Sequence, residues 1–76
     1  MKAYVLIHVR TGQITEVVGN LRRVEGVTEA NMTFGPYDVV AIVNTEDAGA
    51  LGNLIARYIQ PIPGILDTLT CLVVEV

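Results

Sequence analysis

Residues 34–40 read Phe-Gly-Pro-Tyr-Asp-Val-Val, and this stretch predicts a tight turn between two strand-like segments. Glycine tolerates positive φ and proline pre-sets φ, so the Gly35-Pro36 pair is typical of a turn. The turn places Tyr37 and Asp38 at the start of the second strand, where a fixed backbone can present polar groups to a ligand or a partner. The rest of the chain has no obvious nucleophile–base pair. Function must therefore be read mainly from this turn and its surroundings.

Four segments of the chain have the composition of strands. Residues 27–34 and 37–44 flank the turn; the first alternates polar with apolar side chains, and the second is almost continuously apolar. Residues 3–9 are rich in β-branched and apolar types, and residues 65–75 form the last predicted strand. The turn therefore joins the second predicted strand to the third.

Two helices are predicted between these strands. The first begins after a cap at Thr11 or Gly12 and ends before Gly26. The second begins at Thr45, a good N-cap, and ends at Pro61, because the residue before a proline is pushed out of the α region. Apolar residues recur at helical spacing in both. They are Ile14, Val17, Val18 and Leu21 in the first helix, and Leu51, Leu54, Ile55, Tyr58 and Ile59 in the second.

The order of elements is β-α-β-β-α-β, which predicts an α+β fold of the ferredoxin-like type: an antiparallel four-stranded sheet with both helices on one face. Right-handed crossovers put the first and third strands in the centre. A faint internal repeat supports two βαβ units. Residues 21–27 contain a helix end, a glycine and the start of a strand, and residues 59–65 repeat this pattern.

The apolar content is high for so small a chain. A domain of 76 residues buries only about 60–65% of its unfolded surface. Cys71 is the only cysteine, so no intrachain disulfide can stabilise the fold. The first strand is apolar on both faces, although a sheet with one solvated face should alternate cleanly. Its two sets are Ala3, Val5, Ile7 and Val9, and then Tyr4 and Leu6. We expect a second copy of the chain to cover the open face, giving a homodimer with a dimeric α/β-barrel architecture.

Charge and hydropathy bound the other partners. The longest apolar runs are far shorter than the ~18 residues of a membrane-spanning helix, and no signal peptide is recognisable. The net charge is −3 and the basic residues are scattered, which argues against direct binding of nucleic acid. We therefore expect a cytoplasmic homo-oligomer.

A few side chains are candidates for chemistry. His8, the only histidine, has no carboxylate at a spacing that would orient it, so a polar or interface role is favoured over catalysis. Cys71 lies in an apolar strand without a basic neighbour and is expected to be a buried, inert thiol. Thr68 and Thr70 face one side of a strand, about 7 Å apart, although β-propensity alone can explain them. No metal-ligand spacing is present, so neither a metal nor a cofactor is expected.

Over essentially all 76 residues the chain resembles the effector-binding domain of the Lrp/AsnC transcription regulators, also called the RAM domain. The resemblance rests on the Gly-x-Tyr-Asp turn at residues 35–38 and the apolar strand that follows it. It also rests on the Pro-Gly-Ile step at residues 63–65, which leads into Thr-Leu-Thr-Cys at residues 68–71.

This resemblance implies a non-enzymatic regulatory module that senses a small α-amino acid and controls transcription of amino-acid metabolism. It implies a dimer formed through the open sheet face, often assembled into rings, with the ligand bound between adjacent dimers. The implied ligand-binding residues are Gly35, Tyr37, Asp38, Thr68 and Thr70. Full-length members carry an N-terminal helix-turn-helix domain. Because residues 1–2 lead straight into the first strand, residues 1–76 are expected to be a single stand-alone domain without a DNA-binding part.

Topology gives a further expectation. If the third and fourth strands begin at opposite ends of the sheet, Tyr37 and Thr68 lie on the order of 20 Å apart. They could then share a ligand only across a subunit boundary.

Other functions fit the same architecture. A small monooxygenase of the dimeric α/β-barrel type would use Tyr4, His8 and Asn44 as interior polar groups. A purely structural partner would pair with a full-length Lrp/AsnC regulator. An ACT-type amino-acid-binding domain has the same strand order.

Overall fold

The computed structural model describes residues 1–76 and confirms the predicted β-α-β-β-α-β order. The second helix is continuous with a short π-helical segment, η1. The elements are β1 (Lys2–Val9), α1 (Ile14–Arg22), β2 (Val27–Met32), β3 (Val39–Asn44), α2 (Ala48–Leu54), η1 (Ile55–Ile59) and β4 (Ile65–Leu72). None of the helices is long and apolar enough to cross a membrane.

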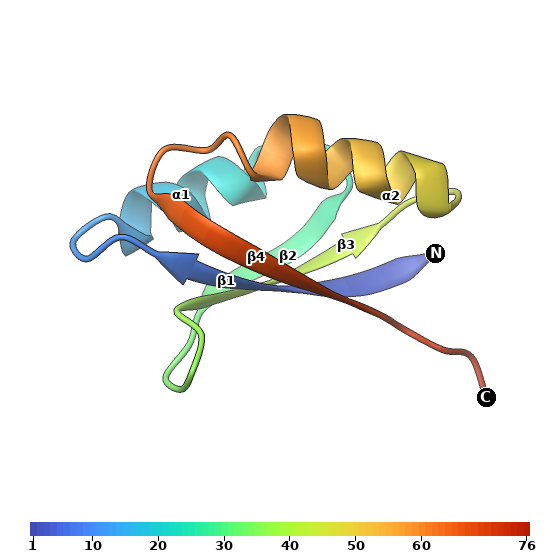
Figure 1. The fold of residues 1–76 in the computed structure, drawn as a ribbon, viewed down its shortest axis with the longest axis horizontal. Helices are drawn as coiled ribbons and strands as arrows, with labels where there is room; N and C mark the ends of the chain where they lie inside the picture. The colour runs from blue at the N-terminus through green and yellow to red at the C-terminus, as the bar shows by residue number, and fades with distance from the viewer.

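The four strands form one antiparallel sheet in the order β2-β3-β1-β4, so β1 and β3 are central, as predicted. Figure 1 shows both helices on the same side of this sheet. The other side carries no element of the chain. The sheet therefore has one face covered by helices and one open face.

The register corrects the expected distance between the two halves of the candidate site. Ile7 of β1 pairs with Val39 on one side and with Thr68 on the other. Because β1 is antiparallel to both neighbours, β3 and β4 run parallel to each other and begin at the same end of the sheet. Two strand spacings, about 10 Å, therefore separate Val39 from Thr68. The expectation of 20 Å between Tyr37 and Thr68 was wrong, because it treated β3 and β4 as antiparallel.

Apolar side chains between the sheet and the helices form the core. All 15 buried residues are hydrophobic, and no buried side-chain polar atom lacks a hydrogen bond. The strands contribute Ala3, Val5, Ile7, Val9, Ala30, Val39, Ala41 and Val43, and the helical side contributes Val17, Val18, Leu21, Leu51, Leu54, Ile59 and Ile62. Both predicted helical stripes contribute to this core. Tyr58 is the exception, since it is 56% exposed.

The helices begin differently from the prediction. The N-cap of α2 is Asp47, whose Oδ1 accepts a hydrogen bond from the Ala50 N–H at 2.8 Å. Thr45 instead donates its hydroxyl to the Asp47 carbonyl at 3.1 Å. The cap position of α1 is Gln13, which makes no side-chain capping bond. Helix α1 therefore depends on the packing of its apolar face.

The two halves of the internal repeat use glycine in the same way. Gly26 and Gly64 have φ of +100° and +99°, and each lies just before a strand. A Cβ on Gly64 would lie 2.7 Å from Gln13 Oε1 and 3.0 Å from Val17 Cγ2. Only glycine fits this connection without strain.

Gly64→Ala should therefore lower the free energy of unfolding by about 1–3 kcal/mol, since it combines an unfavourable φ with a close contact. In a domain of this size the midpoint of thermal unfolding should fall by roughly 4–20 °C. Gly19→Ala is the matched control, because Gly19 lies inside α1 with nothing within 4 Å of its added Cβ. That variant should be stabilised by about 0.4–1 kcal/mol. A Gly64→Ala protein that melts at or above the wild-type temperature would contradict this reading.

The open face is apolar along its centre. Tyr4 pairs with Ile42 and Cys71, and Leu6 pairs with Val40 and Leu69; directly paired residues project to the same side. We use "open face" for these six residues. Tyr4 is 39% exposed and Leu69 is 50% exposed. This confirms that β1 is apolar on both faces.

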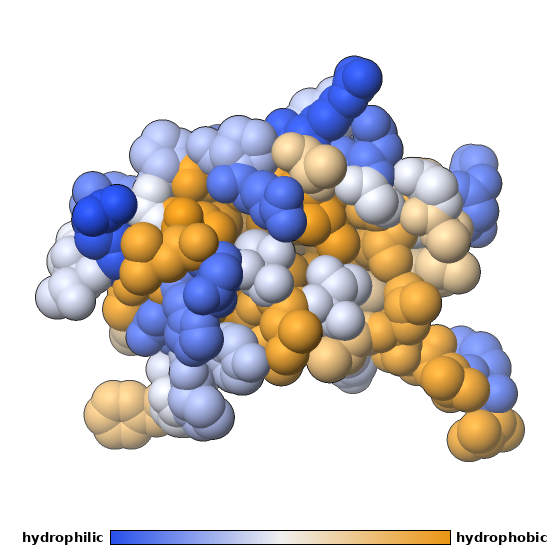
Figure 2. Space-filling model, viewed as in Figure 1, coloured by the Kyte–Doolittle hydropathy of each residue, from blue (hydrophilic) through white to orange (hydrophobic).

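Three apolar side chains are more exposed than the sequence indicated. Cys71 was expected to be buried, but it lies on the open face and is exposed in the single chain. Strand β2 ends at Met32, so Phe34 is fully exposed in the following turn and does not extend the strand. The chain after β4 points away from the sheet, and its exposed Val74 and Val76 make it apolar in Figure 2.

Candidate functional site

The turn between β2 and β3, here called the Gly-Pro turn (residues 34–38), lies at the end of the sheet where β1 finishes and β4 starts. Gly35 has φ of +150° and nothing within 4 Å of the position of a Cβ. Backbone groups are therefore accessible at the tip of the turn. Tyr37 and Asp38, which follow, are both half-buried.

Asp38 anchors the turn to the sheet. Its N–H donates to the Ile7 carbonyl at 3.0 Å, and its Oδ2 accepts from the Val9 N–H at 2.8 Å. Across the turn, the Thr33 N–H donates to the Asp38 carbonyl at 2.9 Å and the Thr33 hydroxyl donates to the Tyr37 carbonyl at 2.8 Å. Asp38 is therefore a structural residue of the turn as well as a candidate ligand contact.

His8 joins the turn to β4. Its ring stacks on the Tyr37 ring with centroids 4.5 Å apart and planes 16° apart. Nδ1 lies 2.7 Å from Asp67 Oδ1, and Nε2 lies 2.8 Å from the Pro36 carbonyl oxygen. The expectation that no carboxylate orients His8 was wrong. Asp67 is 59 residues away in sequence but is the strand partner of His8.

These contacts favour the protonated ring. The hydrogen bond to the Pro36 carbonyl raises the pKa of His8 above the usual 6.5, and the hydrogen bond to Asp67 raises it further. The negative charges of Asp67 and Asp38 act in the same direction, and partial loss of water opposes them.

Thr68 and Thr70 point to the other side of the sheet. They pair with Ile7 and Val5, whose side chains are buried beneath the helices. Thr68 Oγ1 accepts a hydrogen bond from Gln60 Nε2 at 3.3 Å. Within one chain, the structure thus brings Gly35, Tyr37 and Asp38 together, but it does not bring the threonine hydroxyls into the same site.

Two open recesses flank the ends of the sheet. A recess of about 470 Å³ lies beside the Gly-Pro turn, and its lining includes Gly35 and Asp38 together with Ile14 of α1 and the exposed Phe34. Neither Thr68 nor Thr70 lines it. This recess is the one that contains residues of the predicted site.

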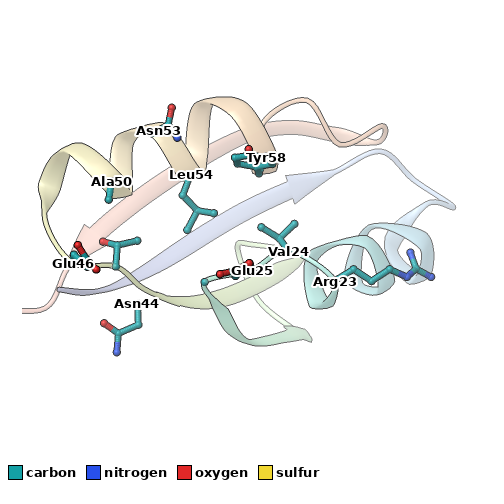
Figure 3. A pocket seen from close by; sticks show the side chains of 11 residues that line it. Arg23, Val24, Glu25, Asn44, Glu46, Ala50, Asn53, Leu54 and Tyr58 are labelled. Atoms are coloured by element: carbon teal, nitrogen blue, oxygen red, sulfur yellow. The ribbon is translucent and has the colours of Figure 1, made fainter.

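The larger recess, of about 600 Å³, lies at the opposite end of the sheet and contains none of the predicted site residues. Figure 3 shows Leu54 and Tyr58 on its helical side, with Val24 and Glu25 facing them from the end of α1.

The polar groups of a monooxygenase are not assembled. Asn44, at the larger recess, pairs with Lys2, six residues along β1 from His8, which is about 20 Å. Tyr4 lies between them on the open face. No group of three or more His, Cys, Asp or Glu side chains is placed to hold a metal ion. The arrangement can recognise a polar ligand, but it offers no convergent catalytic set.

Comparison with known proteins decides the family. The family model described as the Lrp/AsnC ligand binding domain matches residues 2–76. The chain belongs to the Lrp/AsnC ligand-binding-domain family. The resemblance carried by the Gly-x-Tyr-Asp turn at residues 35–38 is thereby confirmed.

Curated relatives of this Lrp/AsnC chain are transcriptional regulators. The HTH-type transcriptional regulator FL11 of Pyrococcus horikoshii is 33% identical over 75 residues, which cover 99% of this chain and 49% of the relative. FL11 of Pyrococcus abyssi is 35% identical over 75 residues, again 99% of this chain and 49% of the relative. The chain therefore spans about half the length of the curated relatives it matches.

Solved structures confirm the Lrp/AsnC fold. TTHA0845 from Thermus thermophilus superposes with a TM-score of 0.93 at 28% identity, covering 99% of this chain and 94% of that chain. E. coli AsnC superposes with a TM-score of 0.92 at 25% identity, covering 97% of this chain and 50% of that chain.

Proposed function

We propose that this chain is a non-enzymatic regulatory module that binds a small α-amino acid where subunits meet and assembles through the open face. Membership of the Lrp/AsnC ligand-binding family and relatives that are transcriptional regulators support a regulatory, effector-binding role. Action in the cytoplasm on transcription of amino-acid metabolism, by a stand-alone domain without its own DNA-binding part, belongs to the same proposal.

The observation that carries the proposal is the anchored Gly-Pro turn beside a recess. An amino acid presents an ammonium group and a carboxylate, and it needs acceptors for the first and donors for the second. Asp38 uses Oδ2 to accept from Val9 and has no further hydrogen bond from its side chain, so Oδ1 is free to accept from an ammonium group. The exposed backbone at Gly35 and the Tyr37 hydroxyl are the matching donors.

The threonines would complete the site from another chain. The hydroxyls of Thr68 and Thr70 lie on the helix side of β4, outside the recess beside the turn. A ligand at the Gly-Pro turn of one subunit would meet them only if a neighbouring subunit supplied them. The reason for an intersubunit site is therefore the direction of these side chains, and no longer the distance along the sheet.

A distant structural neighbour is consistent with this ligand class. The transcriptional regulator NMB0573 from Neisseria meningitidis was solved as a complex with L-Met, and it superposes with a TM-score of 0.87 at 16% identity. At this identity the likeness concerns the fold alone.

Titration calorimetry against the twenty amino acids tests the proposal. At least one should bind, and ligand at about 100 times its Kd should stabilise the fold by about 2.7 kcal/mol. Tyr37→Ala should weaken binding by roughly ten-fold or more, since it removes a donor at the site. Tyr58→Ala is the matched control, because Tyr58 lies at the opposite recess. No heat and no thermal shift with millimolar amino acids would overturn the proposal.

A second candidate function is favoured by the exposed apolar sheet. A purely structural module would pair its open face with the corresponding face of a full-length Lrp/AsnC regulator and change its assembly. Co-expression with such a regulator distinguishes the two. Mixed assemblies that form at the same level with and without amino acids would favour the structural role.

A further inference from the structure

The only histidine of the chain touches three separate parts of the candidate site. From β1, His8 contacts Asp67 on β4, the carbonyl of Pro36 and the ring of Tyr37. We propose that His8 is a positioning residue whose doubly protonated ring clamps the tip of the Gly-Pro turn to β4, so that effector affinity falls when the ring loses a proton. The affinity part of this inference rests on the proposed function, whereas the clamp itself does not.

Hydrogen-bond chemistry decides which form of the ring holds the clamp. A backbone carbonyl only accepts, and so does an ionised carboxylate. The Pro36 carbonyl and the Asp67 carboxylate therefore both require an N–H from His8. The neutral imidazole has one N–H and the imidazolium has two. Deprotonation must break one of the two contacts.

The surrounding charges place this change above the usual pKa of histidine. The groups that face the ring are Asp67 from β4, Asp38 at the start of β3, and Tyr37 from the turn. Both carboxylates favour the cationic ring, and the pKa of His8 is raised. Because the pKa is higher in the folded protein than in the unfolded one, the clamp is fully formed below about pH 6.5. It is lost as the pH rises through the raised value.

The clamp acts on the tip of the turn, because other bonds hold its base. Asp38 bonds to Ile7 and Val9, and Thr33 bonds to Tyr37 and Asp38, none of which uses the histidine. Loss of the clamp should leave the sheet and the base of the turn folded. What changes is the position of the Pro36 carbonyl and the Tyr37 ring. A ligand that needs the clamped position then binds more weakly in proportion to the fraction still clamped.

Nuclear magnetic resonance between pH 5 and 9, without ligand, tests the clamp directly. Signals of His8, Tyr37 and Asp67 should shift together with one midpoint above 6.5. In Asp67→Asn, which keeps an acceptor but not the charge, the midpoint should move to lower pH. In His8→Gln the Tyr37 signals should be independent of pH. Turn signals that do not follow the His8 titration, or a His8→Gln variant that keeps the wild-type pH dependence, would overturn the clamp.

Calorimetry with the amino acid that binds tests the consequence for affinity. For the wild type, Kd should rise roughly ten-fold from a pH below the midpoint to a pH well above it. For His8→Gln, Kd should be weak and flat across the same range. Equal pH dependence in both proteins would overturn the positioning role. A turn that titrates as described in a protein that binds no amino acid would support the clamp and overturn the proposed function alone.

Discussion

Replacing Leu6 with aspartate should convert the protein from a dimer or larger assembly into a monomer of 8.2 kDa. Leu6 lies at the centre of the open face, between Val40 on β3 and Leu69 on β4. Burying an unpaired carboxylate in an apolar interface costs several kcal/mol, and every 1.4 kcal/mol changes an equilibrium constant ten-fold. The dissociation constant of the dimer should therefore rise by about three orders of magnitude.

Sedimentation equilibrium and circular dichroism together separate dissociation from unfolding. Leu6 faces away from the helices, so the monomeric variant should keep its secondary structure, although it loses the stability that association supplies. Thr15→Asp is the control, since Thr15 is exposed on α1, on the other side of the sheet. It adds the same charge and should leave the assembly unchanged. A Leu6→Asp protein with the wild-type mass would show that the open face is not the interface.

Asp38→Ala should lower the free energy of unfolding by about 1–3 kcal/mol, because the Val9 N–H loses its acceptor. The unfolding midpoint should fall by roughly 4–20 °C in a domain of this size. The loss of ligand binding in this variant would then have two causes. The alanine variant alone cannot separate a contact with the effector from support of the turn.

Asp38→Asn separates the two roles. The amide oxygen can still accept from Val9, so most of the stability should remain. The negative charge opposite an ammonium group is lost, and affinity for an amino acid should fall by about ten- to a hundred-fold. Glu16→Gln, on the exposed surface of α1, is the control for the change in net charge. Asp38→Asn with wild-type affinity would remove Asp38 from the ligand contacts and leave it a purely structural residue.

The pattern of apolar residues predicted the elements, their order and the uncovered face, but it could not predict the register. Alternation assigns Leu6 to one face and Ile7 to the other without saying what lies beside them. The pairing of His8 with Asp67 depends on a β1–β4 register that joins residues 59 apart in sequence. The parallel course of β3 and β4 follows from the central position of β1, and the distance argument overlooked it.

Local details were limited by competing residues of similar chemistry. Thr45 and Asp47 are both good N-caps, and the backbone chose the one whose side chain reaches Ala50. The candidate site was predictable where it is contiguous, since Tyr37 and Asp38 adjoin the turn. It was not predictable where it depends on side-chain direction, as for Thr68 on β4.

The central claim is that a second copy of the chain covers the apolar sheet, and the mass of the unmodified protein in solution tests it most directly. Sedimentation equilibrium at micromolar concentrations should give a multiple of 8.2 kDa, with two copies as the smallest stable species. A single ideal species of 8.2 kDa across the same concentrations would contradict the account.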